Sequence, residues 1–291
     1  MTMLAILLGV ILERFNNHLD QFRTYGWFVE MIHWTRQRFE HKSYWNDTLA
    51  VLVILLIPVL VIGLVHRQLA GLSILLDFAF SVIILLYCFG PRDLHEAARH
   101  FIEAREHDDQ TKAHGYAVEI IGEPLPEGDS ELFGKIGRTL LIATNQRLLA
   151  VFFWFVVLGP MGAVLYRLSS ILLREARDAS EEGGNGFLQS IRLLFAILNW
   201  IPAHLTAFCY AVIGSFVDAM HEWQRHKGFD ALDPDAAHNM LVCTGLGSLR
   251  MDADSIGFDQ TSLKHILGLG FRTTVIWLTV LALITFAGWA A

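Results

Sequence analysis

Hydrophobic residues along this chain gather into long runs that few polar residues interrupt. A helix needs about 20 largely apolar residues to cross the roughly 30 Å hydrocarbon core of a bilayer. Stretches of this kind lie at about 49–65, 69–89, 148–173, 191–217 and 273–291. The pattern therefore predicts about five transmembrane helices. The short polar sequence 66–68 predicts a tight turn between the first two.

Two of these runs contain residues that disturb a helix. Gly159, Pro160 and Gly162 lie at the middle of the third run, and Pro202 lies inside the fourth. A proline within a membrane helix frees a backbone carbonyl, which a neighbouring helix must satisfy. We therefore expect the third and fourth spans to be the least regular.

The N-terminus is apolar for about 12 residues and then reaches Glu13 and Arg14. Such a segment is too short to cross a bilayer. It also lacks the basic start and the small-residue cleavage site of a signal peptide before Glu13. The sequence predicts a short re-entrant or buried helix at the N-terminus.

The polar segments 13–48, 90–147 and 218–272 carry helical patterns of their own. Leu94, Ala97, Phe101 and Ile102 recur at helical spacing, for example, and predict an amphipathic helix. No segment shows a convincing strand pattern. We expect an all-α polytopic membrane protein, folded as a single domain over residues 1–291, with helical segments outside the membrane.

Composition agrees with a membrane location and narrows the partners. The mean hydropathy is +0.43 and 54% of the residues are hydrophobic, so membrane lipid is an expected partner. The net charge of -7 lacks the basic field that nucleic-acid binding needs, so no nucleic acid is expected. Cys88, Cys209 and Cys243 are widely spaced and indicate neither a disulfide framework nor a zinc site.

Basic residues are distributed unevenly between the polar segments. Of the 22 lysines and arginines, 17 lie in 13–48, 90–147 and 218–272. The positive-inside rule then places these three segments in the cytoplasm. Five spans would place the loop 174–190 and the turn 66–68 on the opposite face of the membrane.

Four polar residues lie inside or beside the apolar runs. A carboxylate such as Asp77 is costly there, so it should face the bundle interior, either in a ligand site or relay, or as a protonated acid bonded to another helix. Asn199, His204 and Thr206 cluster around Pro202. They either bind a ligand or stabilise the kink at the proline.

A second group of candidate residues lies near one membrane face in the predicted topology. Arg92 and Asp93 begin the helix after the second span, and Asn145 and Arg147 precede the third. Two arginines suit an anionic small molecule, because arginine binds phosphate and carboxylate through paired hydrogen bonds. The alternative is that Asp93 caps its helix and pairs with an arginine.

Other patterns do not support a catalytic or metal site. GDSELFGK at 128–135 has the wrong glycine spacing for a phosphate-binding loop. Glu96, His100 and Glu103 share a helix face, but so do the charges of many exposed helices. We expect no metal site and identify no catalytic set of residues. The sequence does not indicate which cofactor, if any, the protein binds.

The runs LAVFFWFVVLGPMGAVLYRLSS (149–170) and LNWIPAHLTAF (198–208) resemble the AmpE family of bacterial inner-membrane proteins. This family is related to the CobD/CbiB cobinamide-phosphate synthases, and the resemblance covers most of the chain. It implies a multi-pass protein of the cytoplasmic membrane with a sensory role in β-lactamase induction and cell-wall recycling. It also implies a membrane or cytoplasmic signalling partner.

The synthases carry acidic motifs just before and at the end of the first of these runs, and this chain departs from them. Ile142 and Gln146 stand in place of the first acidic pair, and Ser170, Ile171 and Leu173 replace the second motif. Carboxylates are the usual ligands for a nucleotide's magnesium ion. The departure favours a regulator without catalysis, such as a sensor or signalling modulator. The alternative is a diverged amide-forming or small-molecule-binding membrane enzyme.

Overall fold

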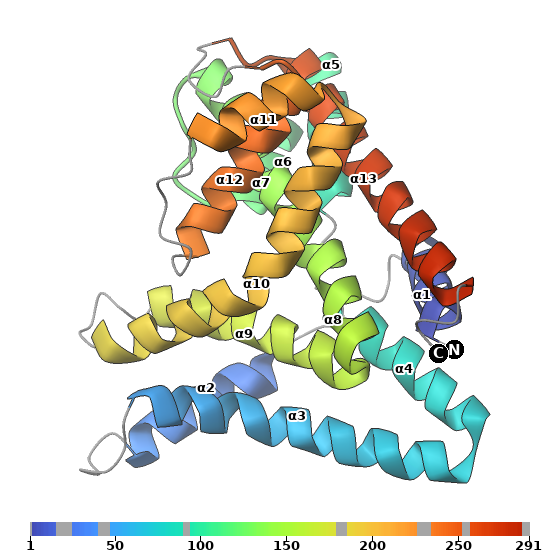
Figure 1. Ribbon diagram of the computed structural model, residues 1–291. Helices are drawn as coiled ribbons and strands as arrows, with labels where there is room; N and C mark the ends of the chain where they lie inside the picture. The colour runs from blue at the N-terminus through green and yellow to red at the C-terminus, as the bar shows by residue number, and fades with distance from the viewer. Residues whose placement is uncertain are drawn as a thin grey trace.

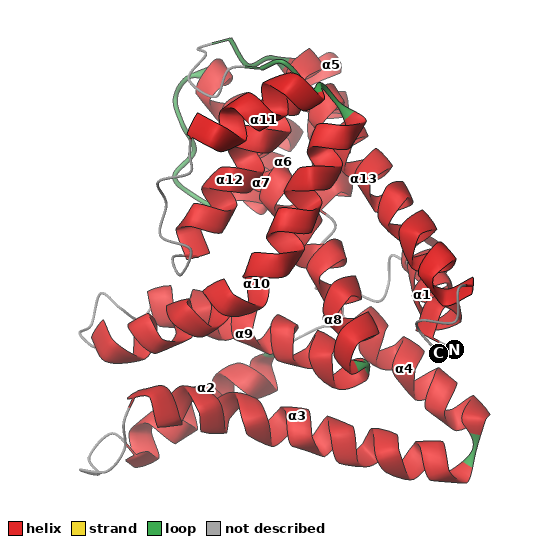
Figure 2. Ribbon diagram, in the orientation of Figure 1, coloured by secondary structure: helices red, strands yellow, loops and turns green. Residues whose placement is uncertain are grey.

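The computed structural model describes residues 2–15, 25–39, 47–89, 94–178, 185–225, 234–251 and 257–286, and the regular structure in these ranges is helical (Figure 2). Four helices are long and apolar enough to cross a membrane: Thr48–Leu72, Asp129–Leu158, Gly186–Ile213 and Gln260–Leu283. A shorter apolar helix covers Ile74–Cys88. The chain is an all-α polytopic membrane protein, which confirms the predicted fold class.

The elements follow one another as shown in Figure 1. They are α1 (Thr2–Phe15), α2 (Gly26–Phe39), α3 (Asp47–Leu72), α4 (Ile74–Cys88), α5 (Leu94–Glu106), α6 (Gln110–Ile121), α7 (Asp129–Thr144), η2 (Asn145–Leu149), α8 (Ala150–Leu158), α9 (Pro160–Asp178), α10 (Asn185–Ile213), α11 (Phe216–Arg225), α12 (Pro234–Ser248) and α13 (Gln260–Phe286).

Buried apolar residues form two separate cores. The first joins α1 to α4 with α8, α9, the first half of α10 and the second half of α13, and the second joins α5 to α7 with α12, the second half of α10 and the first half of α13. The boundary crosses three continuous helices, because the members of each of these pairs belong to different cores: Leu141 and Leu149, Leu198 and Ala203, and Leu269 and Trp277. In Figure 1, α10 changes direction between its two halves. The segments that connect the cores are therefore η2, the middle of α10 and the part of α13 between Leu269 and Trp277.

The N-terminal segment forms the short helix that the sequence predicts. Ala5 and Ile6 of α1 are buried in the first core, while Leu4 and Ile11 are exposed. A β-carbon on Gly9 would lie 3.2 Å from Leu85 of α4, so the two helices approach closely at this glycine. α1 is thus a packed helix on the side of α4.

The predicted turn at 66–68 is wrong. α3 continues through these residues to Leu72, and the chain reverses at Ser73, whose side chain accepts a hydrogen bond from the Leu75 amide. Arginine and glutamine are good helix formers, so a short polar sequence does not by itself end a helix. His66 also gains a partner inside the hairpin, because its Nε2 lies 2.9 Å from Oδ1 of Asp77.

The predicted third span, 148–173, is not a single helix. α7, η2 and α8 run without interruption from Asp129 to Leu158, and the chain then breaks at Gly159, which has a φ of 65°. Residues with a β-carbon rarely adopt this left-handed region of backbone conformation, but glycine adopts it readily. Pro160 then begins α9, as prolines often do at a first helical position.

This break changes the place of the following loop. Oγ of Ser190 lies 3.0 Å from Oγ1 of Thr48, at the start of α3. Arg177 and Arg192 both contact Asp235 of α12. Such contacts cannot reach across a hydrocarbon core of about 30 Å. The prediction that 174–190 lies on the opposite membrane face from 13–48 and 218–272 is therefore wrong, because α9 turns back at Gly159.

Candidate functional site

The long helix that crosses both cores contains a π-helical turn at Asn145–Leu149. The Ala150 amide donates to the Asn145 carbonyl, five residues earlier. A π turn widens the helix by one residue and is frequent at functional sites. Here the turn directs both Asn145 and Arg147 into buried positions.

α10 has its own irregularity beside this turn. Pro202 has no amide proton, so the Leu198 carbonyl loses its usual partner within the helix. Nε1 of Trp154, on α8, donates a 2.9 Å hydrogen bond to that carbonyl. The neighbouring helix thereby satisfies the carbonyl that Pro202 leaves free. A membrane protein needs such a partner, because no water is present in the bilayer core.

Four buried side chains connect the π turn with the proline helix, and we call them the asparagine network: Asn145, Tyr166, Asn199 and Thr206. Nδ2 of Asn145 and the Tyr166 hydroxyl each donate a 2.9 Å hydrogen bond to Oδ1 of Asn199. The Thr206 hydroxyl donates to Oδ1 of Asn145 at 3.0 Å. Nδ2 of Asn199 is buried without a hydrogen-bond partner among the described residues. The network thus lies at the core boundary with one donor unsatisfied.

A chain of polar contacts leads from the π turn to the surface. Nε2 of Gln146 lies 2.6 Å from Nε2 of His238, and Nδ1 of His238 lies 3.8 Å from Asp235. Asp235 also binds Nη2 of Arg177 at 2.7 Å and Nη2 of Arg192 at 3.0 Å. The neighbouring His238 and Arg177 side chains hold the pKa of Asp235 well below its usual range. We call these five residues the outer polar chain.

Of the predicted anion-binding residues, Arg147 is described and Arg92 and Asp93 lie outside the described residues. Nε of Arg147 donates to the Phe89 carbonyl at 3.2 Å, directly after α4. Arg167 makes a similar contact with the Cys88 carbonyl. Both arginines satisfy carbonyls that the end of a helix leaves free. Asn145 lies in the asparagine network, so it faces Asn199.

The other predicted residues lie elsewhere. Nδ1 of His204 lies 2.7 Å from the Trp200 carbonyl, and the imidazole packs against Trp200 and Trp223. Asp77 pairs with His66 in the α3–α4 hairpin. The structure does not bring either residue into the asparagine network.

Helical spacing distinguishes Thr206 from His204 as the residue that shares a face of α10 with Asn199. Residues seven apart share a helix face, while residues five apart do not. Thr206 is seven residues after Asn199, and His204 is five residues after it. Tyr166 and Trp154 had no comparable signal, because their approach to α10 depends on the reversal at Gly159.

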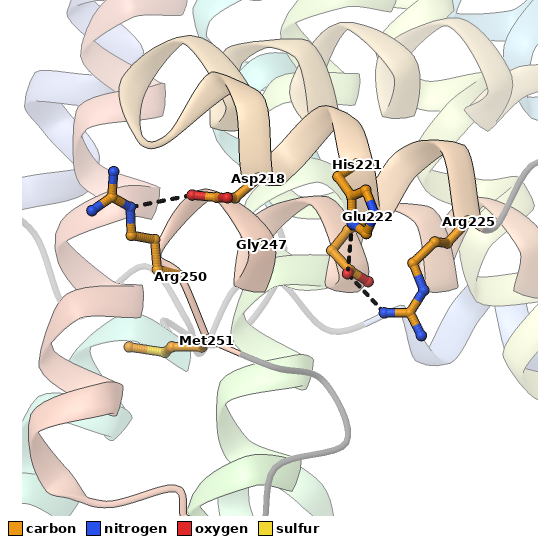
Figure 3. Close-up of a pocket in the computed structure, with 7 residues that line it drawn as sticks. All are labelled: Asp218, His221, Glu222, Arg225, Gly247, Arg250 and Met251. Carbon is orange, nitrogen blue, oxygen red and sulfur yellow. Dashed lines mark hydrogen bonds and ion pairs between the residues drawn. The ribbon is translucent and has the colours of Figure 1, made fainter.

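An open groove lies between α11 and the end of α12, with a volume of about 470 Å³ (Figure 3). Its lining residues are Asp218, His221, Glu222, Arg225, Gly247, Arg250 and Met251. Both carboxylates are paired, with Arg250 at 3.2 Å and Arg225 at 2.9 Å (Figure 3). Sequence reasoning missed this groove, although the i, i+4, i+7 spacing of Asp218, Glu222 and Arg225 marks one helix face.

Two curated bacterial relatives carry the name "Cobalamin biosynthesis protein CobD". The protein from Stutzerimonas stutzeri is 25% identical over 72% of this chain and 73% of its own length. The protein from Chromobacterium violaceum is 27% identical over 67% of this chain, and the match spans 62% of that relative. No solved structure matches significantly.

A protein-family model matches almost the whole chain. It covers residues 1–290 and is described as "Regulatory signalling modulator protein AmpE". The matched region includes the π turn, the proline helix and every residue of the asparagine network. The chain therefore belongs to the AmpE family.

Proposed function

We propose that this protein is a regulatory sensor or signalling modulator of the bacterial inner membrane that works without catalysis. The family description supports a regulatory role, and the resemblance in sequence points to β-lactamase induction and cell-wall recycling. The observation that carries the proposal is the asparagine network, because it joins the two cores at the only two helix irregularities found between them in the described residues. A change in the hydrogen bonds of this network would therefore alter the packing of both cores.

The unsatisfied donor supports a network with two arrangements. A buried polar group without a partner costs about 1–3 kcal/mol, which the rest of the fold must offset. An arrangement that pairs Nδ2 of Asn199 would therefore compete closely with the observed one. Coupling between distant sites requires an element with two such states. A bound small molecule or a partner protein could favour either state.

The anionic ligand remains part of this proposal. Arg147 contacts Phe89, immediately before residues 90–93, so Arg92 and Asp93 follow in sequence from a point that lies against the π turn. Asn145, Arg147 and Asn199 are the proposed binding residues in the described part of the chain. His204 and Asp77 are left out, because their contacts lie on other surfaces.

Three glycine-to-cysteine substitutions test the proposed orientation in the membrane. With 174–190 on the same face as 90–147, nearly all basic residues share one side, which we assign to the cytoplasm. Gly71→Cys should react with an impermeant thiol reagent in intact spheroplasts. Gly115→Cys and Gly183→Cys should react only after lysis. A β-carbon has open space at Gly71 and Gly115, so these two changes are sterically mild.

The wild-type chain, which keeps its three native cysteines, is the control for background reaction. Reaction of the Gly115 variant before lysis would reverse the orientation. Reaction of the Gly183 variant before lysis, together with the Gly71 variant, would return the loop 174–190 to the opposite face.

Removing two hydroxyls from the network tests the proposed function. In cells that lack the native gene, the combined Tyr166→Phe and Thr206→Val variant should alter β-lactamase induction severalfold at normal membrane abundance, because both changes remove donors within the network. Thr279→Val is a matched control, since its hydroxyl bonds only the Val275 carbonyl of its own helix on an exposed face of α13. Wild-type induction by the double variant would contradict the proposal.

The second candidate function is a diverged membrane enzyme of the CobD/CbiB type. The curated relatives support it, since both are named for cobalamin biosynthesis. Amide formation or nucleotide hydrolysis by the purified protein, lost on substitution of Asn145, would favour this second candidate over a regulator.

A further inference from the structure

Two arginines from different helices meet one carboxylate at the start of α12. Nη2 of Arg177, from α9, lies 2.7 Å from Oδ1 of Asp235, and Nη2 of Arg192, from α10, lies 3.0 Å from Oδ2. Each carboxylate oxygen thus takes one guanidinium group. Arginines bind the oxygens of carboxylate and phosphate ligands in this way.

All three side chains are open to solvent. The exposed fractions are 40% for Arg177, 38% for Arg192 and 44% for Asp235. An exposed ion pair contributes only about 0–1 kcal/mol, because water solvates both partners well when they separate. An anion from solution could therefore compete with Asp235 for the two guanidinium groups.

We propose that Arg177 and Arg192 form a binding site for a carboxylate or phosphate group, and that Asp235 occupies this site as an internal competitor. The inference deepens the proposed signalling function and rests on it for its biological meaning. It adds a second anion site, at a pair of arginines that the fold assembles from α9 and α10, to the binding residues proposed above.

The outer polar chain connects this site to the π turn. The Nε2 atoms of His238 and Gln146 lie 2.6 Å apart, so one of these nitrogens accepts, and a neutral His238 accepts with Nε2 while its proton is on Nδ1. Nδ1 is the nitrogen that faces Asp235. Displacing Asp235 removes the carboxylate that favours this tautomer. Gln146 then has to change its hydrogen bond, next to Asn145 of the asparagine network.

Phosphate binding to the purified full-length protein tests the site. In phosphatidylcholine nanodiscs, Asp235→Asn should bind inorganic phosphate about tenfold more tightly than wild type, since it weakens the internal competitor's two exposed ion pairs. The combined Arg177→Gln and Arg192→Gln variant should lose binding. Asp129→Asn is the matched control, because Asp129 also binds an arginine, Arg105 at 2.6 Å, but no second arginine contacts it in the described structure.

Amide hydrogen exchange at 145–149 provides a second measurement. Phosphate should raise exchange in this turn of the wild-type protein, and it should have no effect in the double-arginine variant. This comparison does not require the Asp235 variant to fold. A folded Asp235→Asn protein that binds phosphate no more tightly than wild type would overturn the proposal. Unchanged exchange in wild-type protein at saturating phosphate would also overturn it.

Two further comparisons identify the source of the anion and separate this proposal from the previous one. Phosphatidylglycerol that copurifies with the wild-type chain but not with the double-arginine variant would assign the site to a lipid phosphate. Its absence, with phosphate binding retained, would assign the site to a soluble anion. The last comparison concerns induction. If the wild-type protein binds phosphate but the double-arginine variant shows unaltered β-lactamase induction, the anion site stands and the proposed signalling function is contradicted.

Discussion

Gly162→Ala is expected to lower the stability of the protein by about 3 kcal/mol and to reduce its abundance in the membrane, since overpacking without room to relax is costly. A β-carbon at Gly162 would overlap the Trp154 carbonyl oxygen. That oxygen belongs to the backbone of α8, so it cannot move aside as a flexible side chain could. The α8–α9 hairpin would have to open. Membrane abundance and the thermal midpoint in detergent measure the effect.

Gly115→Ala is the matched control for this substitution. It lies within α6, and a β-carbon there would have nothing within 4 Å. Alanine should stabilise the helix by about 0.5–1 kcal/mol, because it loses less backbone entropy than glycine. The two substitutions should therefore have opposite signs. Normal stability of the alanine variant at Gly162 would contradict the observed packing of α8 against α9.

Asn199→Ala should destabilise the protein by about 2–6 kcal/mol, because it removes the acceptor for two buried donors and each unpaired donor costs about 1–3 kcal/mol. These donors are Nδ2 of Asn145 and the hydroxyl of Tyr166. The loss of the unsatisfied Nδ2 of Asn199 returns part of this cost. Unfolding in mixed detergent micelles, followed at several temperatures, measures the difference.

Two milder variants place this effect on a scale. Tyr166→Phe removes one donor while Asn199 keeps its hydrogen bond from Asn145, so the expected loss is about 1 kcal/mol. Asn239 is exposed on α12, and its change to alanine should alter stability by less than about 0.5 kcal/mol. Equal effects at Asn199 and Asn239 would show that the asparagine network does not hold the two cores together.

The asparagine network and the outer polar chain suit different roles. The network is buried, so its hydrogen bonds are strong and its rearrangement is costly unless new partners form. The outer polar chain ends in exposed charges that a ligand can reach. An accessible input next to a buried two-core contact is the arrangement that a signalling modulator needs, and the AmpE family match makes that role the expected one.

Long apolar runs were enough to predict the all-α membrane fold, the short N-terminal helix and the irregularity of the segment around Gly159 and of α10. The hydrophobic requirement of a bilayer acts on each segment separately, so it can be read without knowing which helices touch. The sequence also identified the polar residues near Pro202. It did not identify the residues that they contact.

Only the tertiary structure decided how the chain reverses and which polar groups meet. Gly159 marks a break in sequence, but the direction of α9 after it depends on packing against α3 and α10. That direction brings Tyr166 to Asn199 and Arg177 to Asp235. These contacts join residues 33 and 58 positions apart. Local propensity and charge counts carry no information at such separations, because the contact exists only after both helices have packed.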